Sequence, residues 1–216
     1  MAELAVVMPE LISEMGSVLQ RTAAANDLNS PGRLQKMSSV FHGLTRPAIS
    51  VESYLERIFK YANCSHSCFV VAYIYLHRFS RRQPLLRINS FNVHRLLIAS
   101  VLVSVKFMDD LFYNNAYYAK VGGIGTKEMN ILEVDFLFGI GFNLNVTPST
   151  FHTYCSHFIA QIQAQRPHYP GFLQQLGEVV SNHHHQCCIE EDDECIDHHH
   201  QQHHYPMLAA AIYSAN

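Results

Sequence analysis

Long apolar runs are scarce in this sequence. The most apolar stretch, residues 96–105, is far shorter than the roughly 20 residues that a membrane-spanning helix needs. The N-terminus is apolar, but Glu3, Pro9 and Glu10 interrupt it, and it lacks the basic start and small-residue cleavage site of a signal peptide. We therefore expect a soluble chain with no membrane partner, located in the cytoplasm or the nucleus.

Cysteine, glycine, proline and charge are also limited. The six cysteines form no disulfide framework, and a chain that is not exported keeps its thiols reduced. Glycine and proline together fill 18 positions and charged residues only 15%, whereas 48% of the residues are hydrophobic, which excludes disorder throughout. A chain of 216 residues buries roughly 70% of its unfolded surface, so it needs neither disulfide nor metal to fold. We expect no cofactor.

Helical periodicity dominates, and the alternation typical of strands is nearly absent. A first helix is predicted between Pro9 and Arg21, with Pro9 in its first turn, followed by a turn-rich linker up to residue 47. Five helices then follow between residues 48 and 165, which predicts one compact all-α domain. They are 51–62, 68–79, 91–108, one after the loop 122–125 with Thr126 as N-cap and Gly139 or Gly141 at its end, and one opened by Thr147 and Pro148.

Residues 166–216 differ in composition from the rest. They carry one basic and seven acidic side chains, and residues 183–204 alone hold eight histidines, three cysteines and six acidic residues. Such a segment has too little apolar surface to offset the entropy lost on ordering, so we predict a largely disordered tail. Its imidazoles and thiols could bind Zn²⁺ or copper, although the repetitive spacing is not that of a closed four-ligand site.

Two charged positions accompany apolar stripes. Arg95 and Lys106 are eleven residues apart in the predicted helix 91–108, which is otherwise apolar nearly all round, and this spacing puts them on one side. Glu133 and Leu137 lie beside the core stripe of the next helix, on a shoulder. These positions form either a surface for a partner or an ordinary boundary between core and solvent.

The sequence resembles a cyclin box over roughly residues 5–165, and within the cyclins it is similar to the plant P-type (U-type) group, relatives of the fungal phosphate-signalling cyclins. The resemblance implies a single box of five helices. The segments that carry it are SYLERIFK (53–60), VAYIYLHRF (71–79), INSFNVHR (88–95), SVKFMDD (104–110), NNAYYAK (114–120) and TKEMNILE (126–133).

This resemblance implies a regulatory subunit that binds and activates a cyclin-dependent kinase, in the cell cycle or in phosphate signalling. By motif, Lys106 and Glu133 would grip the kinase's mobile regulatory helix, and we expect both to be open to solvent, side by side. Apolar contacts would come from four further positions. These are Phe107, Leu137, Phe142 and Leu144.

The resemblance also implies an internal brace at Arg57. The family commonly has an Asp where this chain has His77, which puts the ion pair of the brace in doubt. The chain would not be an enzyme and would bind neither nucleic acid nor a small-molecule substrate. The loop 122–125 is interpreted as a helix-entry loop rather than a phosphate loop, because Lys127 follows Thr126.

Two other functions stay open at this stage. One is an adaptor or transcription-related module with the cyclin fold and no kinase partner. The other is a metal-binding protein that acts through the His/Cys tail.

Overall fold

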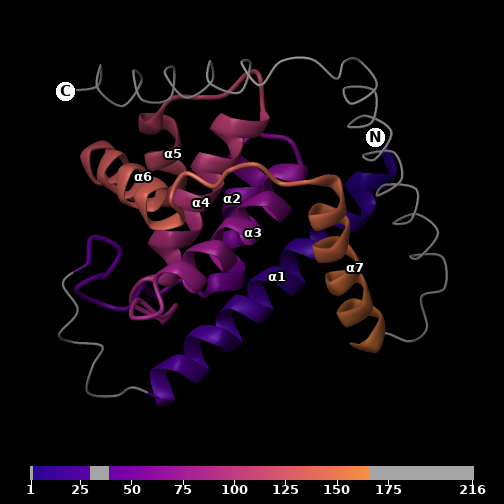
Figure 1. Ribbon diagram of the computed structural model, residues 1–216, viewed down its shortest axis with the longest axis horizontal. Coiled ribbons are helices and arrows are strands. Elements are labelled where there is room, and N and C mark those ends of the chain that lie inside the picture. Colours follow the sequence, from indigo (N-terminus) through magenta and orange to yellow (C-terminus); the bar gives the residue numbers. More distant parts are fainter. Residues whose placement is uncertain (1, 30–38, 166–216) are drawn as a thin grey trace.

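The computed structural model describes residues 2–29 and 39–165, which form seven helices and no strand (Figure 1). The predicted all-α class is confirmed within this part of the chain. The helices are α1 (Ala2–Leu28), α2 (Val51–Tyr61), α3 (Ser67–Arg82), α4 (Val93–Met108), α5 (Asn115–Gly122), α6 (Thr126–Ile140) and α7 (Pro148–Gln165). The predicted disorder and metal binding of the tail, residues 166–216, lie outside the described residues.

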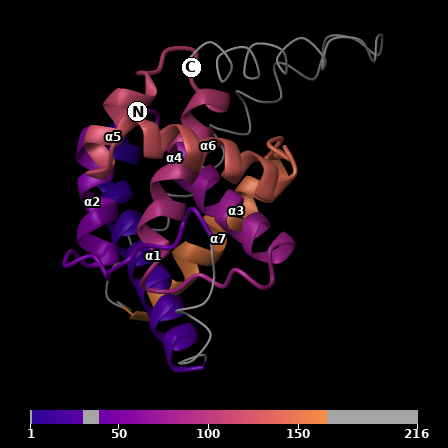
Figure 2. The same cartoon turned by 90° about the vertical axis from the view of Figure 1, so that its left-hand side faces the viewer.

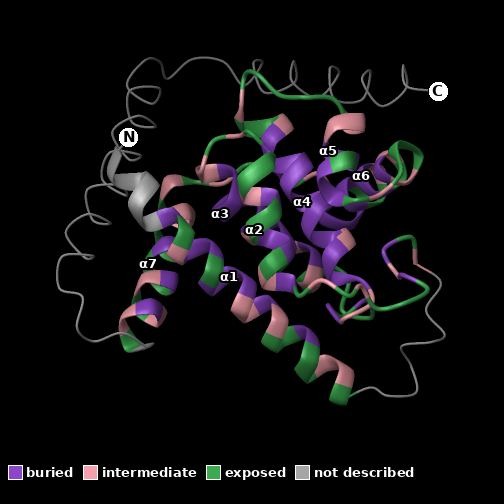
Figure 3. Cartoon of the chain, turned by 180° about the vertical axis from the view of Figure 1, so that it is seen from behind, coloured by how far each residue is buried: buried purple, intermediate pink, exposed green. Residues whose placement is uncertain are grey.

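Helix α4 is the centre of the fold, as its sequence predicted. All its residues from Val93 to Val105 are buried except Arg95, and Figure 3 shows it enclosed by its neighbours. Helices α2, α3, α5 and α6 all pack against it. An α-helix that is apolar nearly all round is stable only when other helices cover every side, because exposed apolar area weakens folding by roughly 25 cal/mol per Å².

Helix α1 is longer than predicted and belongs to the same core. It begins at Ala2, so Pro9 lies inside it rather than in its first turn; proline suits the helical φ and costs one backbone hydrogen bond. The apolar stripe packs against α2 and α7 (Figures 1 and 2). The backbones of α1 and α2 approach closely at Gly16, where an added Cβ would lie 2.8 Å from Glu52 Cα. The stripe comprises Met8, Leu11, Ile12, Met15, Leu19 and Ala23.

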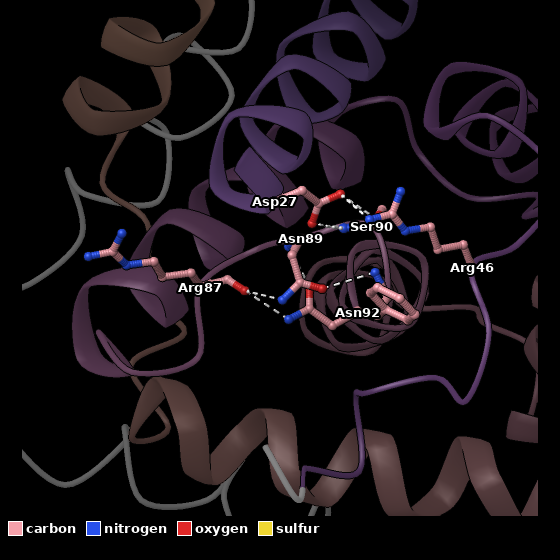
Figure 4. Close-up of polar contacts among 7 residues, drawn as sticks. Asp27, Arg46, Arg87, Asn89, Ser90 and Asn92 are labelled. Carbon is pink, nitrogen blue, oxygen red and sulfur yellow. Dashed lines mark hydrogen bonds and ion pairs between the residues drawn. The ribbon is translucent and has the colours of Figure 1, made fainter. Parts of the chain in front are cut away.

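Polar contacts fasten the end of α1 to the segment that leads into α4 (Figure 4). The Asp27 carboxylate accepts hydrogen bonds from the Ser90 backbone N–H (3.3 Å) and hydroxyl (2.5 Å) and pairs with Arg46 at 3.4 Å. Beside it, Asn89 and Asn92 each donate to the carbonyl of Arg87. These bonds satisfy buried polar groups in the non-helical segment before α4 and fix the position of α1 relative to α4.

The structure adds α5, which periodicity did not predict. Asn114 caps it by accepting a hydrogen bond from the Tyr117 N–H, and Gly123 ends it in the left-handed conformation with φ +71°. Gly125, rather than Thr126, is the N-cap of α6, because Thr126 already lies in the helix. The interpretation of 122–125 as a helix-entry loop is confirmed, since it connects these two helices.

The ends of α6 and the start of α7 follow the sequence more closely. Gly141, with φ +62°, terminates α6 as predicted, whereas Gly139 lies within the helix against the ring of Phe79. Helix α7 begins at Pro148, and the hydroxyl of Thr147 accepts a hydrogen bond from the Thr150 N–H at 3.2 Å. Proline in the first turn with a threonine before it is the expected start of a helix.

Candidate functional site

The two cations of α4 both reach acids of α6. Arg95 Nε lies 2.6 Å from Glu128 Oε1, and Lys106 Nζ lies 2.6 Å from Glu133 Oε1. The prediction that Arg95 and Lys106 share one side of the helix is therefore confirmed. Because both are paired within the chain, that side of α4 is an interface between helices along most of its length.

The exposure predicted for Lys106 and Glu133 is wrong. The two lie side by side, but the Lys106 side chain is only 10% exposed and that of Glu133 only 2%. They neutralise each other, and a charge removed from water is stable only with such a partner.

Helix α5 is the reason for this burial. Asn115, in its first turn, donates from Nδ2 to Glu133 Oε2 at 2.7 Å and to Asn130 Oδ1 at 2.8 Å. Both carboxylate oxygens of Glu133 are therefore bonded, one to α4 and one to α5. The signal that could have revealed α5 is the Asn114 cap, an asparagine at the start of an eight-residue helix.

Two of the four predicted apolar contact residues lie in the core. Leu137 is 1% exposed and Leu144 3%, so the expectation that they face a partner is wrong for this conformation. Leu137 is one turn after Glu133 and is buried together with it, because both are on the side of α6 that faces α4. Phe142 is half-buried, with φ +55°, and Phe107 is 39% exposed, so these two remain accessible.

Sequence reasoning missed other exposed apolar residues around this pair. Phe138 on α6 is 68% exposed, and its ring contacts that of Phe142 edge to face at 5.2 Å between centroids. A second group, which we call the α4 edge, follows directly after Lys106. It consists of Phe107, Met108, Leu111, Phe112 and Tyr113, all of them exposed. Exposed aromatic side chains in such number are typical of a protein-binding surface.

The chemistry of this surface suits a helix of another protein. An ammonium group has three N–H donors, and Lys106 uses one of them on Glu133. Each carboxylate oxygen has a second acceptor site beyond the bond it already makes. Lys106 can therefore offer a donor to a partner, whereas the Glu133 carboxylate is buried and bonded at both oxygens.

Arg57 contacts α5 and not α3, the helix that holds position 77, where the family commonly has the Asp that pairs with it. Its guanidinium donates to the carbonyl of Lys120 at 3.2 Å, which links α2 to the last turn of α5. A cation near the C-terminus of a helix is electrostatically favourable. His77 instead contacts the hydroxyl of Tyr154 on α7. Arg57 and His77 therefore have separate partners and do not contact each other as a brace.

Burial of Cys68 and Cys155 disfavours thiol catalysis at these two residues. Burial raises the pKa of Cys155 to about 12, so its reactive thiolate is scarce at neutral pH.

Among the described helices, none has the length and apolar character needed to cross a membrane.

Comparison with known proteins gives consistent matches. Residues 1–144 match the family described as Cyclin, which covers α1 to α6. Cyclin-U4-1 of Arabidopsis thaliana is 64% identical over 162 residues, covering 74% of this chain and 80% of that protein. Cyclin-P4-1 of Oryza sativa subsp. japonica is 59% identical over 158 residues, covering 71% and 74% respectively.

Proposed function

The chain belongs to the cyclin family, within its plant U-type and P-type group, and from this premise we propose that it binds and activates a cyclin-dependent kinase. The observation that carries the proposal is membership of the cyclin family, because the Lys106–Glu133 pair is buried and neutralised within the chain rather than open to solvent as the sequence predicted. The chain itself would catalyse no reaction. We place its action in the nucleus or the cytoplasm.

The proposed contact combines charge with apolar area. Lys106, whose side chain is 10% exposed, would donate to carbonyl oxygens of the kinase's regulatory helix, whereas Glu133, 2% exposed, would hold the ammonium group in place rather than contact the kinase. The apolar contacts would come from Phe107, Phe138 and Phe142, which are accessible, rather than from Leu137 and Leu144. Buried aromatic anchors supply most of the affinity in such interfaces.

Activation would follow from a population shift. An isolated kinase of this class holds its regulatory helix outward, which leaves the Lys–Glu pair of its active site unmade. A partner that binds only the inward state shifts the equilibrium toward it by its difference in affinity for the two states. The role would be in cell division or in phosphate signalling.

The alternative of a cyclin-fold adaptor without a kinase is less favoured. The similar relatives carry cyclin names, which supports the kinase proposal over the adaptor. The metal-binding alternative rests on the tail, outside the described residues.

A charge swap separates a binding role of the pair from a structural one. The double variant Lys106→Glu with Glu133→Lys restores an ion pair of opposite polarity and replaces the donor at position 106 with an acceptor. Because Asn115 donates to Glu133, circular dichroism first checks that the variant folds. We expect the full-length chain to capture a cyclin-dependent kinase from plant extract and to raise its activity on a histone substrate. The double swap should lose at least about tenfold in binding.

The matched control lies on the same two helices. Arg95→Glu with Glu128→Arg swaps the other α4–α6 ion pair and should leave kinase binding unchanged. If the swap at 106 and 133 binds as tightly as the wild type, the pair has a structural role only. If the wild type neither captures nor activates a kinase, the proposed function is wrong.

A further inference from the structure

Two cysteines and an aspartate meet where three elements converge. Cys64 lies in the turn after α2, Cys68 in the first turn of α3, and Asp109 is the C-cap of α4. Their two sulfur atoms and a carboxylate oxygen all lie within 4.8 Å of one another. Cys68 is buried and the other two are half-buried, so the cluster has one side open to water.

The local backbone holds these groups in place. Asn63, with φ +48°, turns the chain after α2, and the Cys68 N–H donates to the Ser65 carbonyl at 3.1 Å. The Ser65 backbone N–H donates to Asp109 Oδ2 at 2.9 Å, and its hydroxyl donates to Oδ1. The carboxylate is thus oriented by hydrogen bonds from the residue next to Cys64. Metal-ligating carboxylates in proteins are held by such bonds from neighbouring groups.

We propose that this cluster is a Zn²⁺ site, with Cys64, Cys68 and Asp109 as ligands and water in the fourth position. Thiolates favour Zn²⁺ over Mg²⁺ or Ca²⁺, which take oxygen ligands. Bond lengths of about 2.3 Å to sulfur and 2.0–2.2 Å to oxygen place tetrahedral ligand atoms about 3.5–3.8 Å apart. Side-chain rotations that move the ligand atoms by about 1 Å achieve that spacing from the one observed.

Metal binding at this site exchanges protons for the cation. Zn²⁺ displaces one proton from each thiol to solvent and forms two Zn–S bonds, with no change in oxidation state. Affinity therefore rises with pH.

A Zn²⁺ ion bound by Cys64, Cys68 and Asp109 would join the turn between α2 and α3 to the end of α4. Asp109 is the third residue after Lys106, and the α4 edge begins at Phe107. A cation bound there would restrain the segment that carries those residues. This inference does not depend on the kinase proposal, because the site is complete within the chain apart from water.

The test uses the full-length chain with Cys187, Cys188 and Cys195 changed to Ser, which removes the tail thiols. The probe is Co²⁺, titrated in the presence of reductant. We expect Co²⁺ to give a thiolate-to-cobalt charge-transfer band, which the eight histidines of residues 183–204 cannot produce, and added Zn²⁺ should abolish it. Cys64→Ser or Cys68→Ser should remove the thiolate band, and Cys155→Ser should keep it.

Asp109→Asn leaves both thiols and the contact with Ser65 possible, so it tests the third ligand separately. It should weaken Zn²⁺ binding by about tenfold or more. A second readout is the thermal unfolding midpoint, which Zn²⁺ should raise for the tail-substituted chain but not for its Cys64→Ser derivative. Absence of a thiolate band, a band that survives both cysteine substitutions, or unchanged affinity in Asp109→Asn would each overturn the site.

Discussion

Lys106 and Glu133 form an ion pair of 2.6 Å that joins the last turn of α4 to α6, and Asn115 of α5 bonds the second carboxylate oxygen. Three helices thus meet at one buried carboxylate. The pair is therefore part of the fold as well as of the proposed kinase surface, and substitutions at either residue affect stability before they affect binding.

Lys106→Met should destabilise the domain by about 3 kcal/mol, because it leaves the Glu133 carboxylate buried without its counter-charge. Methionine keeps most of the lysine's apolar stem, so lost packing contributes little. Urea denaturation monitored by circular dichroism measures the change in the free energy of unfolding.

The double variant Lys106→Met with Glu133→Gln provides the control. A neutral amide still accepts from Asn115 and carries no charge to desolvate, so most of the lost stability should return. If both variants are equally destabilised, loss of the charge pairing is not the cause.

Gly16→Ala should destabilise the domain by about 1–3 kcal/mol, because the new Cβ would meet the backbone of α2 at Glu52 Cα, which cannot rotate away. Gly125→Ala is the comparison: no atom lies within 4 Å of its added Cβ, so it loses only the N-cap preference of glycine over alanine, about 1 kcal/mol or less. Thermal denaturation of both variants checks this. Equal stability of the two would mean that α1 and α2 separate at low cost.

Much of the fold could be predicted because the residues buried on one side of a helix are apolar and recur in the sequence at helical spacing. Helices α2, α3 and α4 each bury long apolar side chains at helical spacing, and this signal depends on no other part of the chain. Helix α5 was missed because it has only eight residues, too few for a stripe to be recognised between Asn114 and Gly123.

The sequence predicted that Lys106 and Glu133 lie side by side, which they do, but it did not predict their burial. Lys106 and Glu133 are 27 positions apart, and their motifs do not specify what covers them. The unpredicted α5 supplies that cover through Asn115, and burial of Leu137 follows from its place one turn after Glu133. Exposure depends on packing between helices, which the pattern within one helix cannot give.

Asp27→Ala should cost about 1–3 kcal/mol, because it removes the acceptor for the backbone N–H and hydroxyl of Ser90 together with the ion pair to Arg46. Arg46→Gln separates the two effects: it removes the charge pair and the contact of the guanidinium with the Phe91 ring, each worth about 0–1 kcal/mol, but keeps the bonds to Ser90. The free energy of unfolding by urea gives both values. A larger loss in Arg46→Gln than in Asp27→Ala would contradict the assignment.

His94 should make the domain less stable in acid. Burial lowers its pKa, the Nε2 atom lies 3.0 Å from the Ile49 carbonyl, and Nδ1 is buried with no hydrogen-bond partner among the described residues. Since a carbonyl only accepts, Nε2 carries the proton of the neutral ring. Protonation would therefore place an N–H at Nδ1 without an acceptor.

The sign of the pH effect follows from that lowered pKa. The unfolded chain binds a proton at this histidine near pH 6.5, whereas the folded chain binds it only at lower pH, so stability falls as pH decreases below about 6.5. His94→Gln should flatten the dependence of the unfolding free energy on pH between about 7 and 5. The burial of His66 and His77 lowers their pKa values too, so the slope should decrease without vanishing. Parallel curves for variant and wild type would show that His94 titrates alike in both states.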